Sequence, residues 1–145
     1  MNFANPSTFQ IGVLAGVAVI VVLFVITKIF FKKTSNTGLN KKFIREQWNK
    51  INDLMIPGKE MNYKLAVIEA DKLLDYALKA LDFSGDTTAD RLNAAAYKHP
   101  KMKKVWWAHK VRNYIVHDAG YMIKFGETQR VLSLFKKALK ILGGL

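Results

Sequence analysis

The sequence predicts an all-α protein in which a single N-terminal transmembrane helix precedes a bundle of four or five helices. Residues 11–31 are almost wholly apolar and are long enough to cross a bilayer as one helix. In the rest of the chain, apolar residues recur at helical spacing, and no segment shows the alternation of a strand. We therefore divide the 145 residues into a tail and anchor at 1–33, a polar linker at 34–39 and a helical-bundle domain at 40–145.

The apolar segment, which we expect to lie in the lipid bilayer, begins with Ile11 and ends with Phe31. Its only charge is Lys28, close enough to the end for its aliphatic stem to reach the headgroups. The ten residues before the segment are uncharged, whereas several basic residues follow it closely. The positive-inside rule then predicts a single-pass protein of the cell membrane with its N-terminus outside and its domain in the cytoplasm.

Glycine and proline set the expected ends of the helices in the domain. A Pro-Gly pair at 57–58 ends the first helix, Gly85 stops the second, and Pro100 separates the third from the fourth. Gly120 and Gly126 bracket the last connection. The predicted helices cover about residues 41–55, 61–83, 88–97, 101–117 and 127–142.

The net charge of +12 is concentrated in the C-terminal part of the chain. Residues 34–90 carry eight basic and nine acidic groups, whereas residues 91–145 carry twelve basic and two acidic groups. This asymmetry indicates an anionic partner, either a nucleic acid or the anionic lipid headgroups beside the anchor. A solvated lysine-rich surface is the alternative explanation.

The residue types present restrict the chemistry. Because the chain has no cysteine, disulfides, thiolate metal sites and cysteine nucleophiles are excluded. Its three histidines lack the spacing of a metal-binding helix, so we expect neither a metal site nor a cofactor.

Residues 106–118 contain the most distinctive pattern, in which Arg112 and Asn113 precede His117. On a helical wheel, five residues of this segment form an apolar face, namely Trp107, Ala108, Val111, Tyr114 and Ile115. The opposite arc collects Trp106, His109, Arg112, Asn113, Val116 and His117. Because Trp106 and Val116 are unusual on a solvated face, we expect this arc to meet a second copy in a homodimer.

This motif resembles that of the HEPN superfamily, whose members are helical bundles with an arginine followed by a histidine after four to six residues, often with a polar residue directly after the arginine. The resemblance covers about residues 40–143, and residues 66–92 also look like the helical portion of small bacterial HEPN-like proteins. Nuclease members of that superfamily cleave single-stranded RNA at a dimer interface without a metal.

Carried over to this chain, the resemblance implies that His117 exchanges protons with the ribose 2′-hydroxyl or the leaving oxygen. Arg112 would stabilise charge on the phosphorus, and Asn113 would orient the phosphate or the partner histidine. In a catalytically silent scaffold, Arg112 would instead tie helices together and His117 would cap a helix end.

Two further residues are predicted to support the motif. Glu69 lies on the apolar arc of the second helix, whereas Asp71 and Asp75 lie on its polar arc. An ionised carboxylate among apolar residues needs a partner. We expect Glu69 to hold Arg112, with a backbone group or lysine as the alternative partner, and His109 to be a supporting or interface group.

Basic residues and an aromatic ring interleave near the motif, as in proteins that bind single-stranded nucleic acid. The residues are Trp106, Lys101, Lys103, Lys104 and Lys110. The sequence thus leaves three functions open: a membrane-anchored ribonuclease, an interaction module that recruits a protein or nucleic acid to the membrane, and a lipid-surface domain without an RNA partner.

Overall fold

Five α-helices and one short 3-10 helix make up the domain in a computed structural model that describes residues 38–145, and no strand occurs in that range. The α-helices are α2 (Lys41–Asp53), α3 (Glu60–Ala80), α4 (Thr88–Lys98), α5 (Val105–His117) and α6 (Phe125–Ile141), with η1 (Pro100–Lys104) before α5. The domain is therefore an all-α bundle, as predicted. The predicted anchor lies outside the described residues, and none of the helices within them is long and apolar enough to cross a membrane.

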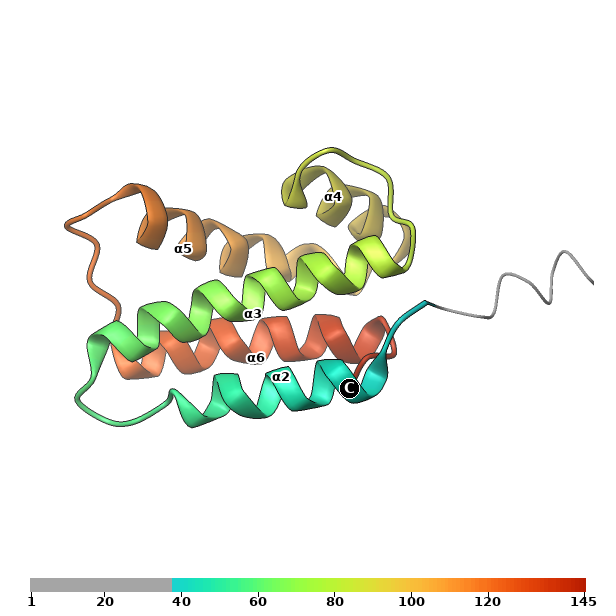
Figure 1. Cartoon of the computed structure of the whole chain (residues 1–145). Helices are drawn as coiled ribbons and strands as arrows, with labels where there is room; N and C mark the ends of the chain where they lie inside the picture. Colours follow the sequence, from blue (N-terminus) through green and yellow to red (C-terminus); the bar gives the residue numbers. More distant parts are fainter. Residues whose placement is uncertain (1–37) are drawn as a thin grey trace, which may run out of the picture. The chain divides into compact units, whose positions relative to one another are not determined.

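Helix α3 is the central element of the bundle. It packs against α2 and α6 on one side and against α4 and α5 on the other (Figure 1). Because its neighbours cover most of its circumference, α3 buries residues on several faces, including Tyr63, Ala66, Val67, Ala70, Asp71, Leu73, Leu74, Ala77 and Leu78. All of these except Asp71 join Ile44 of α2 and Phe135 of α6 in one apolar core.

Side-chain caps explain where two of the helices begin. The Asn40 side chain accepts a hydrogen bond of 3.0 Å from the backbone N–H of Phe43 at the start of α2. At the start of α4, Thr87 and Asp90 form a reciprocal capping box. Each cap satisfies donors that the first turn of a helix leaves unpaired.

The structure differs from several of the predicted ends. Helix α3 ends at Ala80, where Asp82 takes the left-handed φ of +56°, and is not stopped by Gly85. The predicted helix at 101–117 begins as the 3-10 turn Pro100–Lys104 and becomes α-helical at Val105. Gly126 lies within the first turn of α6 and not in the connection before it. Leu39, placed in the polar linker, is only 7% exposed and belongs to the core, so the packed domain begins within that segment.

Gly85, between α3 and α4, has a backbone φ of +136° that L residues rarely adopt. A Cβ there would lie against the Cβ of Asp90 and 2.8 Å from the backbone nitrogen of Arg91. We expect Gly85→Ala to lower the free energy of unfolding by about 1–3 kcal/mol, measured by urea denaturation. As a matched control, Gly126→Ala places its methyl group in open space within a helix and should instead stabilise by about 0.5–1 kcal/mol.

Candidate functional site

The motif arginine is held on α5 by a carboxylate from α3. The Nε of Arg112 lies 3.2 Å from Oδ2 of Asp71, and its Nη1 donates a hydrogen bond of 3.0 Å to Oδ1 of Asn113. The Nε–H is not directed at the carboxylate well enough to count as a hydrogen bond, so the contact is an ion pair. The Arg112 side chain remains 26% exposed, although its Nε is buried.

Asp71 is the most deeply buried acidic side chain among the described residues, with 1% exposure. Its second oxygen, Oδ1, lies 2.8 Å from Nδ1 of His109, which is also buried. The Trp106 ring meets the His109 ring edge to face, with centroids 5.9 Å apart. A carboxylate that is removed from water needs such partners, so Asp71, His109 and Arg112 form one polar cluster between α3 and α5.

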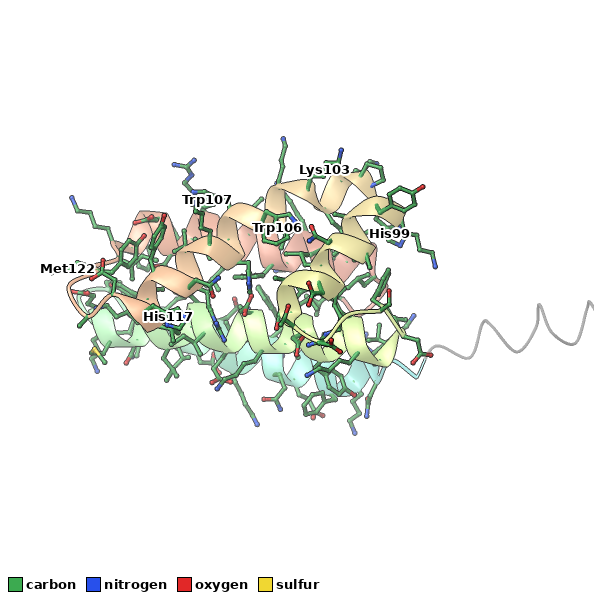
Figure 2. All side chains as sticks on the ribbon, turned by 90° about the horizontal axis from the view of Figure 1, so that it is seen from above. His99, Lys103, Trp106, Trp107, His117 and Met122 are labelled. Atoms are coloured by element: carbon green, nitrogen blue, oxygen red, sulfur yellow. The ribbon has the colours of Figure 1, made fainter. Side chains whose placement is uncertain are left out.

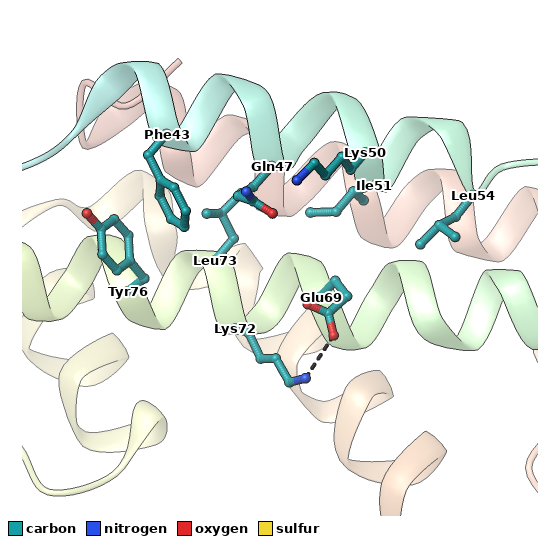
Figure 3. A pocket seen from close by; sticks show the side chains of 9 residues that line it. All are labelled: Phe43, Gln47, Lys50, Ile51, Leu54, Glu69, Lys72, Leu73 and Tyr76. Carbon is teal, nitrogen blue, oxygen red and sulfur yellow. Dashed lines mark hydrogen bonds and ion pairs between the residues drawn. The ribbon is translucent and has the colours of Figure 1, made fainter.

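The prediction that Glu69 holds Arg112 is wrong, and the alternative of a lysine partner is confirmed. The Glu69 carboxylate instead accepts a hydrogen bond of 2.8 Å from Nζ of Lys72, at the rim of a groove between α2 and α3 (Figure 3). At 100° per residue, Asp71 lies about 200° around α3 from Glu69 and so faces α5. Asp71 was placed on the polar arc, but that arc is covered by α4 and α5.

The predicted faces of α5 also need correction. His109, assigned to the arc away from the core, is buried, whereas Trp107 and Tyr114, assigned to the core face, are 39% and 45% exposed. Trp107 lies under the guanidinium of Arg130, 5.4 Å from its ring centroid, and Tyr114 stacks on Tyr121. Helix α5 is at the outside of the bundle, so only a narrow arc of it reaches the core.

His117 ends α5 and is exposed, as is Val116 beside it (Figure 2). Within residues 38–145, the His117 ring makes no hydrogen bond or ion pair. It follows Arg112 by five positions, which is about 7.5 Å along the axis and about 140° around it on an ideal helix. The two motif side chains therefore lie at opposite edges of the arc predicted for α5.

The basic residues of η1 and α5 are exposed, but the aromatic ring among them is not the predicted one. Lys101, Lys103, Lys104 and Lys110 face solvent, whereas Trp106 is half-buried. Trp107 projects from the same edge of the bundle as Lys103 (Figure 2). The exposed aromatic ring beside these lysines is therefore Trp107, which pairs with Arg130. The helical wheel did not predict this because it assigned Trp107 to the core face.

A second, partly buried ion pair lies between α3 and α4. Oδ1 of Asp75, a residue predicted on a polar arc, accepts a hydrogen bond of 2.8 Å from Nε of Arg91 and lies 2.8 Å from Nη2. Nζ of Lys79 lies 2.7 Å from the other oxygen, Oδ2. Burial alone would raise the pKa of Asp75, but the hydrogen bonds from Lys79, Arg91 and Thr88 together lower it below its ordinary value of 3.8.

This lowered pKa makes part of the stability depend on pH. Because the folded state holds the ionised carboxylate, the contribution is present above the unfolded pKa near 3.8 and is lost as the pH falls through the lower folded value. We expect Asp75→Asn to destabilise the domain at about pH 6 and to have a smaller effect at about pH 3, measured by urea unfolding. The exposed Asp53→Asn should show neither effect, and an Asp75→Asn penalty that persists unchanged at acidic pH would contradict the assignment.

The described part of the chain contains no group of three or more histidine or acidic side chains placed to hold a metal ion. Comparisons with protein-family models, with curated proteins and with solved structures find no match for this chain. The groups at the site that could take part in chemistry are therefore those of Arg112, Asn113 and His117.

Proposed function

We propose that this protein is a membrane-anchored, metal-independent endoribonuclease of the HEPN type that acts as a homodimer. One observation carries the proposal: a buried carboxylate holds Arg112, whose side chain stays partly exposed, on the same helix as an exposed His117 that is unpaired within residues 38–145. A fixed cation and a free imidazole are the two groups that transesterification of RNA needs, because the substrate supplies its own nucleophile.

In the proposed reaction, the ribose 2′-oxygen attacks the adjacent phosphorus as the bond to the 5′-oxygen breaks. His117 of one copy removes the proton from the 2′-hydroxyl, and His117 of a second copy donates a proton to the leaving 5′-oxygen. Arg112 offsets the charge that develops on the phosphoryl oxygens. A second copy is needed in this reaction because it uses two imidazoles, whereas each copy of the domain carries one His117.

The proposed location follows from the sequence. Residues 11–31 would insert in the cell membrane, and the basic residues after them would keep the domain in the cytoplasm, where RNA is available. Confinement to a plane raises the effective concentration of the copies, which favours the dimer.

A second function is supported by the ion pair itself. Asp71 already balances the charge of Arg112, which reduces what the guanidinium can offer a phosphate. The domain would then be a non-catalytic module that recruits a nucleic acid or a protein to the membrane. It would bind RNA through its exposed lysines and Trp107 without cutting it.

Incubation of the full-length protein with single-stranded RNA in EDTA tests the proposal. We expect fragments that end in a 2′,3′-cyclic phosphate, and no cleavage of the same oligonucleotide built from 2′-deoxy units. Arg112→Ala should remove the activity, whereas Arg45→Ala, an exposed arginine on α2, should retain it. Cleavage by Arg112→Ala at the wild-type rate would refute the nuclease, and RNA binding without any cleavage would favour the recruiting module.

A further inference from the structure

A groove with a lysine rim and an apolar floor lies where η1 and the start of α5 meet the second half of α6. Its volume is about 220 Å³, and its lining consists of Lys101, Lys104, Val105, Leu134, Lys137, Ala138 and Ile141. No acidic residue lines it, and within residues 38–145 none of its three lysines forms an ion pair. The groove thus presents three free ammonium groups around a hydrocarbon surface.

The groove lies at the end of the bundle where the described chain begins. The C-terminal turn after α6 packs on the first turn of α2, because a Cβ on Gly144 would be 2.9 Å from Cδ1 of Ile44 (Figure 1). Only residues 32–37 separate the apolar segment from this end of the domain. Six residues span at most about 20 Å, which limits how far an anchor that ends at residue 31 could lie from the start of the domain.

We propose that this groove binds one anionic phospholipid, an inference that rests on the membrane anchorage in the proposed function. Lys101, Lys104 and Lys137 would pair with the phosphate oxygens of the lipid, as lysines near an anionic leaflet do. The glycerol backbone and the first acyl carbons would cover Val105, Leu134 and Ile141, and the lysine stems would pack beside them.

The lining favours a lipid over an RNA phosphate as the occupant. RNA bound at a groove without sequence preference places its bases on aromatic rings, and no aromatic side chain lines this groove. The floor also offers no side-chain hydrogen-bond donor to a ribose, whereas an amphiphile matches both the charged rim and the apolar floor. The groove therefore assigns Lys101 and Lys104 to the lipid and leaves Lys103, Lys110 and Trp107 for a nucleic acid.

Lysine labelling of the full-length protein in nanodiscs tests this inference. The labelling rates of individual lysines are read by mass spectrometry in discs of phosphatidylcholine alone and in discs with 30% phosphatidylglycerol, about physiological in anionic content. We expect labelling of Lys104 and Lys137 to slow about fivefold in the anionic discs. Lys136 and Lys140, on the same helix but outside the groove, should change less than about twofold.

A pair of variants with equal charge change separates the groove from general attraction to the surface. Lys104→Gln with Lys137→Gln should abolish the protection of Lys101, whereas Lys136→Gln with Lys140→Gln should preserve it. Equal protection of all these lysines would overturn the groove, as would protection by inorganic phosphate or by single-stranded RNA added to phosphatidylcholine discs.

The outcomes also separate this inference from the proposed function. Protein that enters the discs without selective protection would overturn the lipid site and leave the ribonuclease standing. If the protein does not cleave RNA but Lys104 and Lys137 are still selectively protected, the ribonuclease is overturned and the lipid site stands. Protein that fails to enter the discs would remove the anchorage and overturn the lipid site with it.

Discussion

His117→Ala should reduce the rate of RNA cleavage by about 10²–10⁴-fold, the usual effect of removing a general acid or base. The proposed mechanism uses this imidazole twice, because each copy in the dimer supplies one proton transfer. The side chain is exposed and unpaired in the domain, so its removal should leave the fold and the RNA affinity nearly unchanged. Single-turnover cleavage with saturating protein measures the chemical step directly.

His99→Ala is a matched control for this experiment. His99 lies at the end of α4, where its ring packs edge to face on Phe83 at 6.3 Å, well removed in sequence from the motif. Its removal should change the cleavage rate by less than about twofold. Retention of full activity in His117→Ala would exclude the proposed role of the motif, whatever the result for His99.

Asp71→Ala should lower the free energy of unfolding by about 3–5 kcal/mol, the cost of removing one partner from a buried ion pair. The substitution leaves the buried His109 and the partly buried Arg112 without their shared acceptor. Because Arg112 is partly exposed and water can reach it, we expect the loss in the free energy of unfolding to lie at the lower end of this range, about 3 kcal/mol. Urea unfolding followed by circular dichroism measures the loss, and RNA cleavage should fall too because Arg112 is no longer held.

Glu69→Ala distinguishes the pairing found in the structure from the predicted one. The ion pair between Glu69 and Lys72 is largely exposed, so its removal should cost less than about 1 kcal/mol. A double variant that replaces both Asp71 and Arg112 by alanine should lose less than the sum of the two single variants, since the partners are coupled. Equal destabilisation by Glu69→Ala and Asp71→Ala would show that the Asp71 cluster is not the stabilising one.

Local signals were sufficient to predict the helices of the domain. The Pro-Gly pair at 57–58 and Pro100 act on the backbone at their own positions, and α2 and α4 end a few residues before them. Gly85 does not end α3, which stops at Ala80 where Asp82 takes the left-handed φ of +56°. The motif could also be placed late in the penultimate helix, because the apolar pattern after Pro100 extends to His117.

The partner of Arg112 could not be predicted in the same way. A helical wheel assumes one buried face, but α3 has neighbours on both sides, so its polar arc is also covered. One signal was present: Asp71 follows Val67 by four residues and precedes Leu74 by three, and all three are buried on one stripe. The sequence does not show that α5 supplies His109 and Arg112 to that stripe, since this depends on tertiary packing.

The burial of Leu39 determines where a mechanical pull on the N-terminal side of the domain would act. This side chain is packed in the core two residues before α2 begins, so the chain is fixed to the bundle from residue 39. A pull transmitted through the backbone at residue 38 would act first on Leu39 and on the cap of α2. Helix α2 is therefore the first helix that such a pull would separate from the bundle. Its buried residues Ile44, Trp48 and Ile51 are the contacts that resist this separation.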